Sequence, residues 1–327
     1  MTAVSSVSEL LYLSRQDVES VGLGIGEVID LIEFALSEHA YGRVEMPPKP
    51  GVHPYPGALL HAMPAYVERS HACGIKWVSA FPSNKARGLP NITGVIILND
   101  PETGLPEAVM DATWITAVRT GASTAVAARA FARKDSEFMG ILGTGVQGRT
   151  NLAALKHVLP GLRVVRAYGP HRQTVDRYKE EMEREHKVRV EPTATPDAAV
   201  RGADVLVTAA PWPNPSPSIM PEWLEPGVFA CALDFDASFT PRAVSSFERR
   251  VCDDVATLEY YRGKGYFVGW AGTEELSAVV VGKRPGRQLR NERVLAVNLG
   301  LGMYDVVVAR RVLERSRERG IGRVLPL

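Results

Sequence analysis

Residues 138–155, FMGILGTGVQGRTNLAAL, decide the fold: an apolar segment runs into a glycine-rich turn and then a helix-forming segment. Gly143, Gly145 and Gly148 have GxGxxG spacing. In such a loop the first glycine permits the tight turn, the second lets the backbone approach a pyrophosphate, and the third lets the helix pack on the strand. The helix N-terminus then holds the negative charge. Because a strand pattern precedes the loop and a helix pattern follows it, we predict a dinucleotide site rather than a purely structural turn.

After this loop, strand and helix patterns alternate, which indicates βαβ units and a parallel sheet. Before it, a helical pattern and a proline-rich stretch lead into strand patterns and a helix of small residues at 113–132, and the chain ends in an amphipathic helix. We predict an α/β protein with a Rossmann doubly wound sheet domain and a second α+β substrate and dimerisation domain. The expected ranges are 123–305 for the first and 1–122 with 306–327 for the second.

Composition excludes several classes of function. The chain has 327 residues and a net charge of +1, so nothing favours nucleic acid or an anionic membrane as a partner. No apolar run is long enough for a membrane span, and the N-terminus lacks the pattern of a secretion signal. Three cysteines without a CxxC and seven scattered histidines indicate a reducing, cytoplasmic setting and no metal site.

The identity of the dinucleotide follows from the end of the second strand pattern, residues 163–169. An NAD site usually has an acidic residue there, which binds the ribose 2′-OH. This chain instead continues with His171 and Arg172, two candidate phosphate partners, so we expect NADP(H) to be favoured over NAD(H). The alternative is that both are solvated loop residues. The other predicted cofactor-binding residues are Gly143, Thr144, Gly145, Val146, Gln147, Gly148 and Thr208.

Four stretches of the chain, in order, resemble the ornithine cyclodeaminase/μ-crystallin family. They are GIKWVSAFPSN (74–84), LPNITGVIILNDPETGLPEAVMDATWITAVRTGASTAVAARAFAR (89–133), GILGTGVQGRTNLAAL (140–155) and WLEPGVFACALDFD (223–236). The resemblance covers nearly the whole chain. It implies a homodimer whose first domain forms the dimer, a Rossmann domain, and a substrate between them. It also implies chemistry at the Cα–N bond of an α-amino or α-imino acid.

By position, Arg43, Lys76 and Arg119 match the family's basic residues that hold the substrate carboxylate. Lys76 lies within an apolar strand pattern and Arg119 within a helix of small residues, where an unpaired cation would be costly. The alternative for all three is an internal salt bridge. Thr93 resembles a residue near the cofactor phosphates or the nicotinamide, with an ordinary β-branched strand residue as the alternative.

The strand pattern at 227–234 leads into two carboxylates, Asp234 and Asp236, which in a strand would share one face. Asp236 matches the family's catalytic aspartate, although the lysine that usually follows is missing here. Asp234 has no family counterpart. It is expected either to raise the pKa of its neighbour by proximity or to bind the substrate amino group. His61 stands where cyclodeaminases have a glutamate; it is expected to carry a proton, with a hydrogen-bonded strand histidine as the alternative.

The resemblance and the residues together predict an NAD(P)H-dependent oxidoreductase of the ketimine reductase or amino acid dehydrogenase type. Asp236, Lys76 and His61 are its expected catalytic residues. One alternative is an ornithine or lysine cyclodeaminase, which retains bound NAD and releases ammonia. The other, from a different class, is a crystallin-like protein that binds NADPH and a small ligand with little turnover.

Overall fold

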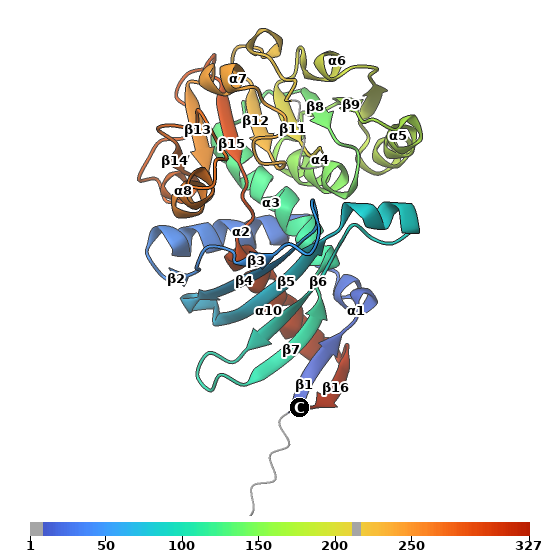
Figure 1. Ribbon diagram of the computed structural model, residues 1–327, viewed down its shortest axis with the longest axis vertical. Coiled ribbons are helices and arrows are strands. Elements are labelled where there is room, and N and C mark those ends of the chain that lie inside the picture. The colour runs from blue at the N-terminus through green and yellow to red at the C-terminus, as the bar shows by residue number, and fades with distance from the viewer. Residues whose placement is uncertain (1–8, 211–216) are drawn as a thin grey trace, which may run out of the picture. The chain divides into compact units, whose positions relative to one another are not determined.

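The computed structural model describes residues 9–210 and 217–327, and the chain divides into two compact units (Figure 1). The first unit consists of Met1–Arg119 and Leu301–Leu327, and the second of Thr120–Gly300. Helix α3 (Thr113–Phe131) carries the chain from one unit into the other. The predicted fold class, a Rossmann domain with a second α+β domain, is confirmed.

The first unit is built on a mixed sheet with the strand order β16-β1-β7-β6-β5-β4-β2, and β3 pairs with β4. Only the β1/β7 pairing in this described sheet is parallel. Helix α10 packs against β4, β5, β6 and α2, so it covers one face of the sheet. The strands are β1 (Glu9–Leu13), β2 (Val44–Glu45), β3 (Gly51–Val52), β4 (Leu59–Val67), β5 (Ala72–Ala80), β6 (Ile92–Asn99), β7 (Pro106–Asp111) and β16 (Arg323–Pro326). The helices are α1 (Arg15–Ser20), α2 (Ile25–Ala40) and α10 (Gly302–Arg319), with 3₁₀ turns at Glu68–Ser70 and Pro82–Arg87.

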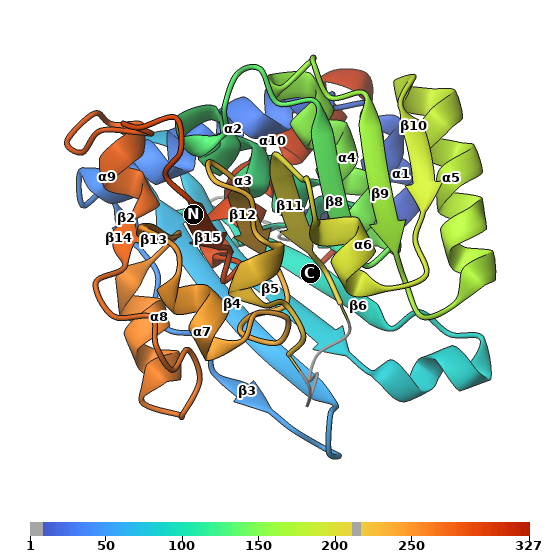
Figure 2. The same cartoon turned by 90° about the horizontal axis from the view of Figure 1, so that it is seen from above.

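The second unit is built on a wholly parallel sheet with the strand order β10-β9-β8-β11-β12-β15-β13-β14 (Figure 2). From β8 the chain first adds strands on one side and then returns to add them on the other. Because parallel crossovers are right-handed, this reversal puts α4 and α5 on one face and α6 on the opposite one. The strands are β8 (Phe138–Leu142), β9 (Val164–Tyr168), β10 (Arg189–Pro192), β11 (Val205–Thr208), β12 (Phe229–Ala232), β13 (Arg249–Cys252), β14 (Glu274–Glu275) and β15 (Val294–Val297). The helices are α4 (Val146–Val158), α5 (Arg172–His186), α6 (Pro196–Val200), α7 (Pro241–Ser245), α8 (Val255–Arg262) and α9 (Leu276–Val280), with a 3₁₀ turn at Pro221–Trp223.

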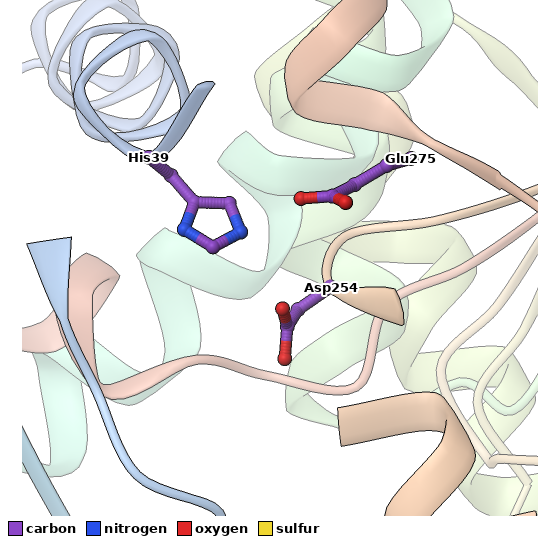
Figure 3. Close-up of side chains that lie close together, drawn as sticks. All are labelled: His39, Asp254 and Glu275. Carbon is purple, nitrogen blue, oxygen red and sulfur yellow. The ribbon is translucent and has the colours of Figure 1, made fainter. Parts of the chain in front are cut away.

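Two carboxylates begin helices of the second unit and are labelled in Figure 3. Asp254 caps α8 by accepting from the backbone N–H of Thr257 at 2.7 Å. Glu275 precedes α9 and accepts from the Ser277 hydroxyl at 3.0 Å. The same view labels His39, which belongs to the last turn of α2 in the first unit. Asp254 thus caps its helix through its side chain, and both carboxylates lie at a helix N-terminus, where a negative charge is stabilising.

Candidate functional site

The glycine loop between β8 and α4 has the geometry of a dinucleotide cradle. Gly143 has φ +109°, and a Cβ there would meet the carbonyl oxygen of Ala209 at 2.2 Å. A Cβ on Gly148 would meet the Gly143 oxygen at 2.4 Å, so α4 packs directly on the loop. Gly145, the N-cap of α4, faces open space within 4 Å. Gly143 therefore suits the tight turn, and Gly148 suits the close packing of the helix. Gly145 leaves the space that a pyrophosphate needs to approach the backbone.

The residues after β9 lie at the start of α5. His171 is the N-cap of this helix, and Arg172 is its first residue. The Arg172 guanidinium is 74% exposed and pairs with Asp176 one turn along, with Nε to Oδ1 at 2.8 Å. No carboxylate lies at the end of β9, where an NAD site usually has one, since Tyr168 is followed by Gly169 and Pro170.

Three charged side chains are buried together in the first unit, and they come from three different elements. Lys76 of β5 pairs through Nζ with Oδ2 of Asp305 on α10 at 2.7 Å. Arg119 of α3 pairs through Nε with Oδ1 of the same carboxylate at 3.1 Å. Within the described residues, no other carboxylate lies within 4 Å of either cation. Lys76 and Arg119 thus share the carboxylate of Asp305, and an internal salt bridge is present. When Lys76 is protonated, the three side chains together carry one excess positive charge.

Burial lowers the pKa of Lys76 to about 7, against the opposing effect of Asp305 and assisted by the positive charge of Arg119. Lys49, from the proline-rich stretch before β3, lowers it further. An anion bound at this cluster would favour the protonated form of Lys76. Neither Asp305 nor Lys49 was among the predicted site residues. The available signals were an aspartate in the otherwise apolar GMYDVVVA segment and a lysine between prolines.

Arg43 does not join this cluster, contrary to expectation. Its guanidinium binds the Glu38 carboxylate with two bonds, Nε to Oε2 at 2.8 Å and Nη2 to Oε1 at 2.6 Å. The backbone carbonyl of Arg43 accepts from the N–H of Glu68, which follows the end of β4. Lys76 pairs with Met63, five residues earlier on the same strand. Five residues of strand span about 16 Å, beyond the reach of one carboxylate. The salt-bridge alternative therefore holds for Arg43.

His61 and Thr93 lie on opposite faces of the first sheet. Met63 of β4 pairs directly with Lys76 of β5. His61 is two residues from Met63 on β4, so its side chain lies on the same face as Lys76, as its diagonal neighbour. Diagonal neighbours are about 7–8 Å apart, within reach of long side chains. Thr93 pairs with Ser79 on the other face, where the two hydroxyl oxygens lie 2.9 Å apart. The register therefore groups His61, but not Thr93, with Lys76.

Asp234 and Asp236 lie in a turn, because β12 ends at Ala232 and the intervening Phe235 has φ +59°. The prediction that they share one strand face is wrong: the apolar pattern continued beyond the last strand residue. Asp234 is 3% exposed and accepts from the hydroxyls of Thr208 and Ser238, each at 2.7 Å, and from the N–H of Ala210 at 3.1 Å. These bonds fasten the end of β11 to the turn. They also engage the buried side chains of Thr208 and Asp234 with each other.

Burial, and not a neighbouring carboxylate, raises the pKa of Asp234. Asp236 is only partly buried, and its Oδ2 accepts from the N–H of Phe267 at 2.8 Å. The second carboxylate of the pair is thus the one that remains accessible.

The hydrogen bond of Asp236 is held between two strained residues. Phe235 has φ +59° and Phe267 has φ +56°, and their rings stack with centroids 5.4 Å apart. A bulky side chain in this left-handed region costs of order 1–3 kcal/mol. The other two such residues in the described chain have an ordinary capping role: His71 ends the 3₁₀ turn Glu68–Ser70, and Lys187 ends helix α5. Strain with no capping role is therefore concentrated around Asp236, as at sites where one side chain must be held in place.

Comparison with known proteins gives consistent matches along the whole chain. A sequence model described as the ornithine cyclodeaminase/mu-crystallin family matches residues 9–320. The alanine dehydrogenase of Archaeoglobus fulgidus is 32% identical over 323 residues, covering 96% of this chain and 97% of that protein. The structure of Thermococcus litoralis Δ¹-pyrroline-2-carboxylate reductase in complex with NADH and L-proline is 30% identical, with TM-score 0.88 and coverage of 96% and 99%. An archaeal alanine dehydrogenase dimer with bound NAD is 31% identical, with TM-score 0.87 and coverage of 97% and 99%.

Proposed function

This chain belongs to the ornithine cyclodeaminase/mu-crystallin family, and we propose that it is an NAD(P)H-dependent oxidoreductase acting on the C–N bond of a small α-imino or α-amino acid. It is of the ketimine reductase or amino acid dehydrogenase type. The similar proteins named above include a reductase of a cyclic imino acid and a dehydrogenase of an amino acid. The glycine loop supports the dinucleotide, and the charged cluster of the first unit supports the acid.

The observation that carries the proposal is the buried cluster of Lys76, Arg119 and Asp305. One carboxylate between two cations leaves a site for a second carboxylate, which charge-assisted hydrogen bonds would hold. Arginine supplies a planar fork for this purpose, and a lysine with a pKa of about 7 can both bind the acid and exchange a proton near neutral pH.

Substitution of Arg119 tests this assignment directly. We expect Arg119→Ala to raise KM for the acid substrate by about tenfold or more, the worth of one charge-assisted bond, and to leave cofactor affinity unchanged. Arg43→Ala is the matched control, because Arg43 is engaged with Glu38. Equal effects of the two variants on KM would refute the role of the cluster.

The chemistry requires one hydride and one proton for each C=N bond reduced. When bound, the reduced nicotinamide supplies the hydride to the imine carbon. Asp236 is the proposed donor of the proton to the imine nitrogen, and it accepts a proton from the amine in the oxidative direction. The N–H of Phe267 orients its carboxylate. His61, on the face of Lys76, is the proposed proton carrier of the first unit.

Within nicotinamide dinucleotides, the proposed preference is NADP(H). The support is local: no carboxylate ends β9, and His171 and Arg172 begin α5. Replacing both with alanine should raise KM for NADPH more than KM for NADH. If the unaltered protein prefers NADH strongly, this preference is wrong and the pair is only a solvated helix start.

A homodimer formed through the first unit is proposed from the uncovered face of its sheet. This face, opposite Lys76 and α10, presents Tyr12, Trp77 and Val95, each 39–40% exposed. An exposed apolar patch of this kind is typical of an interface. The role of this unit in substrate binding and dimerisation is part of the same proposal. Sedimentation of the protein should show a dimer that a Trp77→Glu substitution weakens.

A cytoplasmic location is also proposed, and its support is that Cys73, Cys231 and Cys252 are free thiols. Among the described residues, no helix combines the length and the apolar character needed to cross a membrane.

A further inference from the structure

A hollow of about 470 Å³ lies in the second unit, at the C-terminal end of α3. It is lined by residues between 129 and 135 and by residues 287–290. Of its ten lining residues five are lysine or arginine, and one, Asp135, is acidic. The lining segments come just before β8 and just before β15, so the hollow is at the amino edge of the parallel sheet. The glycine loop follows β8 and lies at the carboxyl edge, where such sheets bind cofactors.

The positive charge in this hollow exceeds the charge of the carboxylates that pair with it. Asp135 binds Arg290 at 2.5 Å and lies 3.9 Å from Arg133, which also pairs with Asp204. Lys134 and Arg287 bond backbone carbonyls instead, Lys134 that of Arg129 at 2.8 Å and Arg287 that of Phe131 at 2.6 Å. In the described chain, neither has a carboxylate within 4 Å. Leaving Arg129 aside, four cations face two carboxylates, an excess of two charges.

Helix capping explains only part of this excess. Cations at a helix C-terminus stabilise its carbonyls, and Lys134 and Arg287 both do so for α3. However, a helix end carries only about half an elementary charge. The remainder, roughly 1.5 positive charges, is available to a bound anion.

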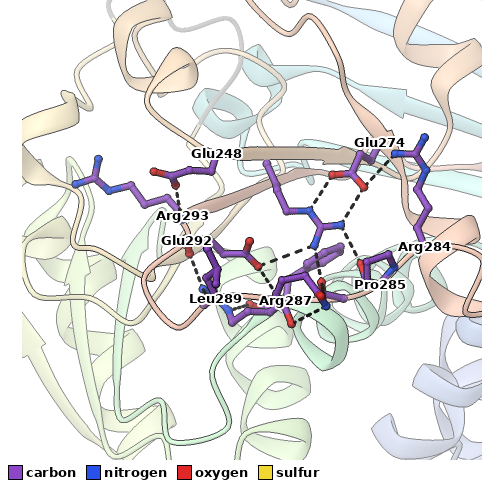
Figure 4. A network of polar contacts seen from close by, with 12 residues as sticks. Glu248, Glu274, Arg284, Pro285, Arg287, Leu289, Glu292 and Arg293 are labelled. Carbon is purple, nitrogen blue, oxygen red and sulfur yellow. Dashed lines mark hydrogen bonds and ion pairs between the residues drawn. The ribbon is translucent and has the colours of Figure 1, made fainter.

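A polar network fixes the lining segment 287–290 (Figure 4). Arg249 binds Glu274 through Nε at 2.8 Å and Nη2 at 2.9 Å, and it also donates to the carbonyl of Pro285 at 2.9 Å. Glu292 accepts from the N–H of Gln288 at 2.7 Å and lies 3.9 Å from Arg249. The Arg287 N–H donates to the Ala130 carbonyl at 2.9 Å, which fixes this segment to α3.

The surroundings of Arg287 destabilise its positive charge. Burial lowers its pKa, Glu292 opposes this, and the charges of Arg133 and Arg249 lower the pKa further. A bound anion would relieve the repulsion among these guanidinium groups.

We propose that this hollow is a binding site for a small phosphate monoester, separate from the cofactor and acid sites. A monoester carries about 1.5 to 2 negative charges at pH 7, which matches the remaining charge of the hollow. Arginine forks are suited to phosphate oxygens. A pocket of this size is in the range, about 300–1,000 Å³, that accommodates a small organic molecule, so there is room for the group esterified to the phosphate.

Calorimetry on the protein saturated with NADH tests the site, with ribose 5-phosphate as the probe and ribose and citrate as comparisons. We expect saturable binding of ribose 5-phosphate and none of ribose. The double variant Lys134→Gln, Arg290→Gln should weaken the binding about tenfold or more. Both side chains are exposed, so the fold should tolerate the change.

Arg184→Gln with Arg189→Gln is the matched control, because it removes the same charge from exposed positions elsewhere. It should leave binding within about twofold of the unaltered protein. Equal weakening by the two double variants would overturn the proposal, as would failure of ribose 5-phosphate to bind. Tighter binding of citrate would also overturn it. Because the readout is binding, none of these results depends on the oxidoreductase activity.

Discussion

Binding of the substrate carboxylate should be coupled to protonation of Lys76. With a pKa of about 7, Lys76 is largely neutral at pH 8, and the Arg119–Asp305 pair is then balanced in charge. A carboxylate bound beside it should raise the pKa of Lys76 by about 1 to 3 units, the usual effect of a close opposite charge. The protonated fraction at pH 8 would rise from about 0.1 to between about 0.5 and 0.99, an uptake of about 0.4 to 0.9 proton for each carboxylate bound.

The sign of the pH dependence follows from this uptake. Because binding takes up a proton, affinity for the acid should fall as pH rises above the pKa of about 7 of Lys76. Near pH 8 the fall should be about threefold to eightfold per pH unit. Below pH 7, where Lys76 is already protonated, affinity should level off.

Calorimetry in two buffers with different ionisation enthalpies measures the uptake. The ligand should be pyrrole-2-carboxylate, which carries no other group that titrates near neutral pH, and the protein should be saturated with reduced cofactor. Lys76→Met is the matched control and should show the uptake abolished. If the unaltered protein takes up no proton at pH 8, or if Lys76→Met takes up as much, the assignment of Lys76 to the carboxylate is refuted.

Three further experiments test other parts of the site. Asp236→Asn should lower kcat by about 10²-fold or more, the usual loss of an acid/base group, with an unchanged melting temperature; turnover at the original rate would remove Asp236 from the mechanism. Phe235→Gly and Phe235→Ala both lose the ring, but only glycine relieves the positive φ, so urea unfolding should show the glycine variant more stable by about 1 kcal/mol; the reverse order would show that the turn is unstrained. Asp305→Asn leaves two buried cations without a carboxylate and should lower the unfolding free energy by about 3–5 kcal/mol. Asp176→Asn, in an exposed pair, is the control and should change the unfolding free energy by less than about 1 kcal/mol. Equal losses would mean that burial of the cluster does not affect stability.

The Rossmann unit could be predicted from the sequence because its signals are local. A strand, a GxGxxG turn and a helix within residues 138–155 specify one another, and the close contacts of Gly143 and Gly148 fit a tight turn and direct helix packing. The pairing of Lys76 with Asp305 could not be predicted in this way. The two residues lie more than two hundred positions apart in the chain and meet only because α10 returns to the sheet of the first unit.

The strand end at β12 and the ion pair of Arg43 are two features that the sequence pattern does not show. A continuous apolar run does not show where a strand stops, so Asp234 and Asp236 were expected on one strand face, although β12 ends at Ala232 and Phe235 lies in a turn. Arg43 was assigned to the substrate carboxylate because its position matches a basic residue of the family. Its local partner Glu38, on the preceding helix, is close enough to engage it first.

Redox chemistry at the C–N bond is distinguished from cyclodeamination by its cofactor stoichiometry. The protein should be incubated with cyclic and acyclic α-imino acids and either NADPH or NADH, while the absorbance of the reduced nicotinamide and the amino acid formed are followed together. We expect one molecule of reduced cofactor to be consumed for each amino acid produced. Conversion of ornithine to proline with release of ammonia and no net change in the cofactor would contradict it.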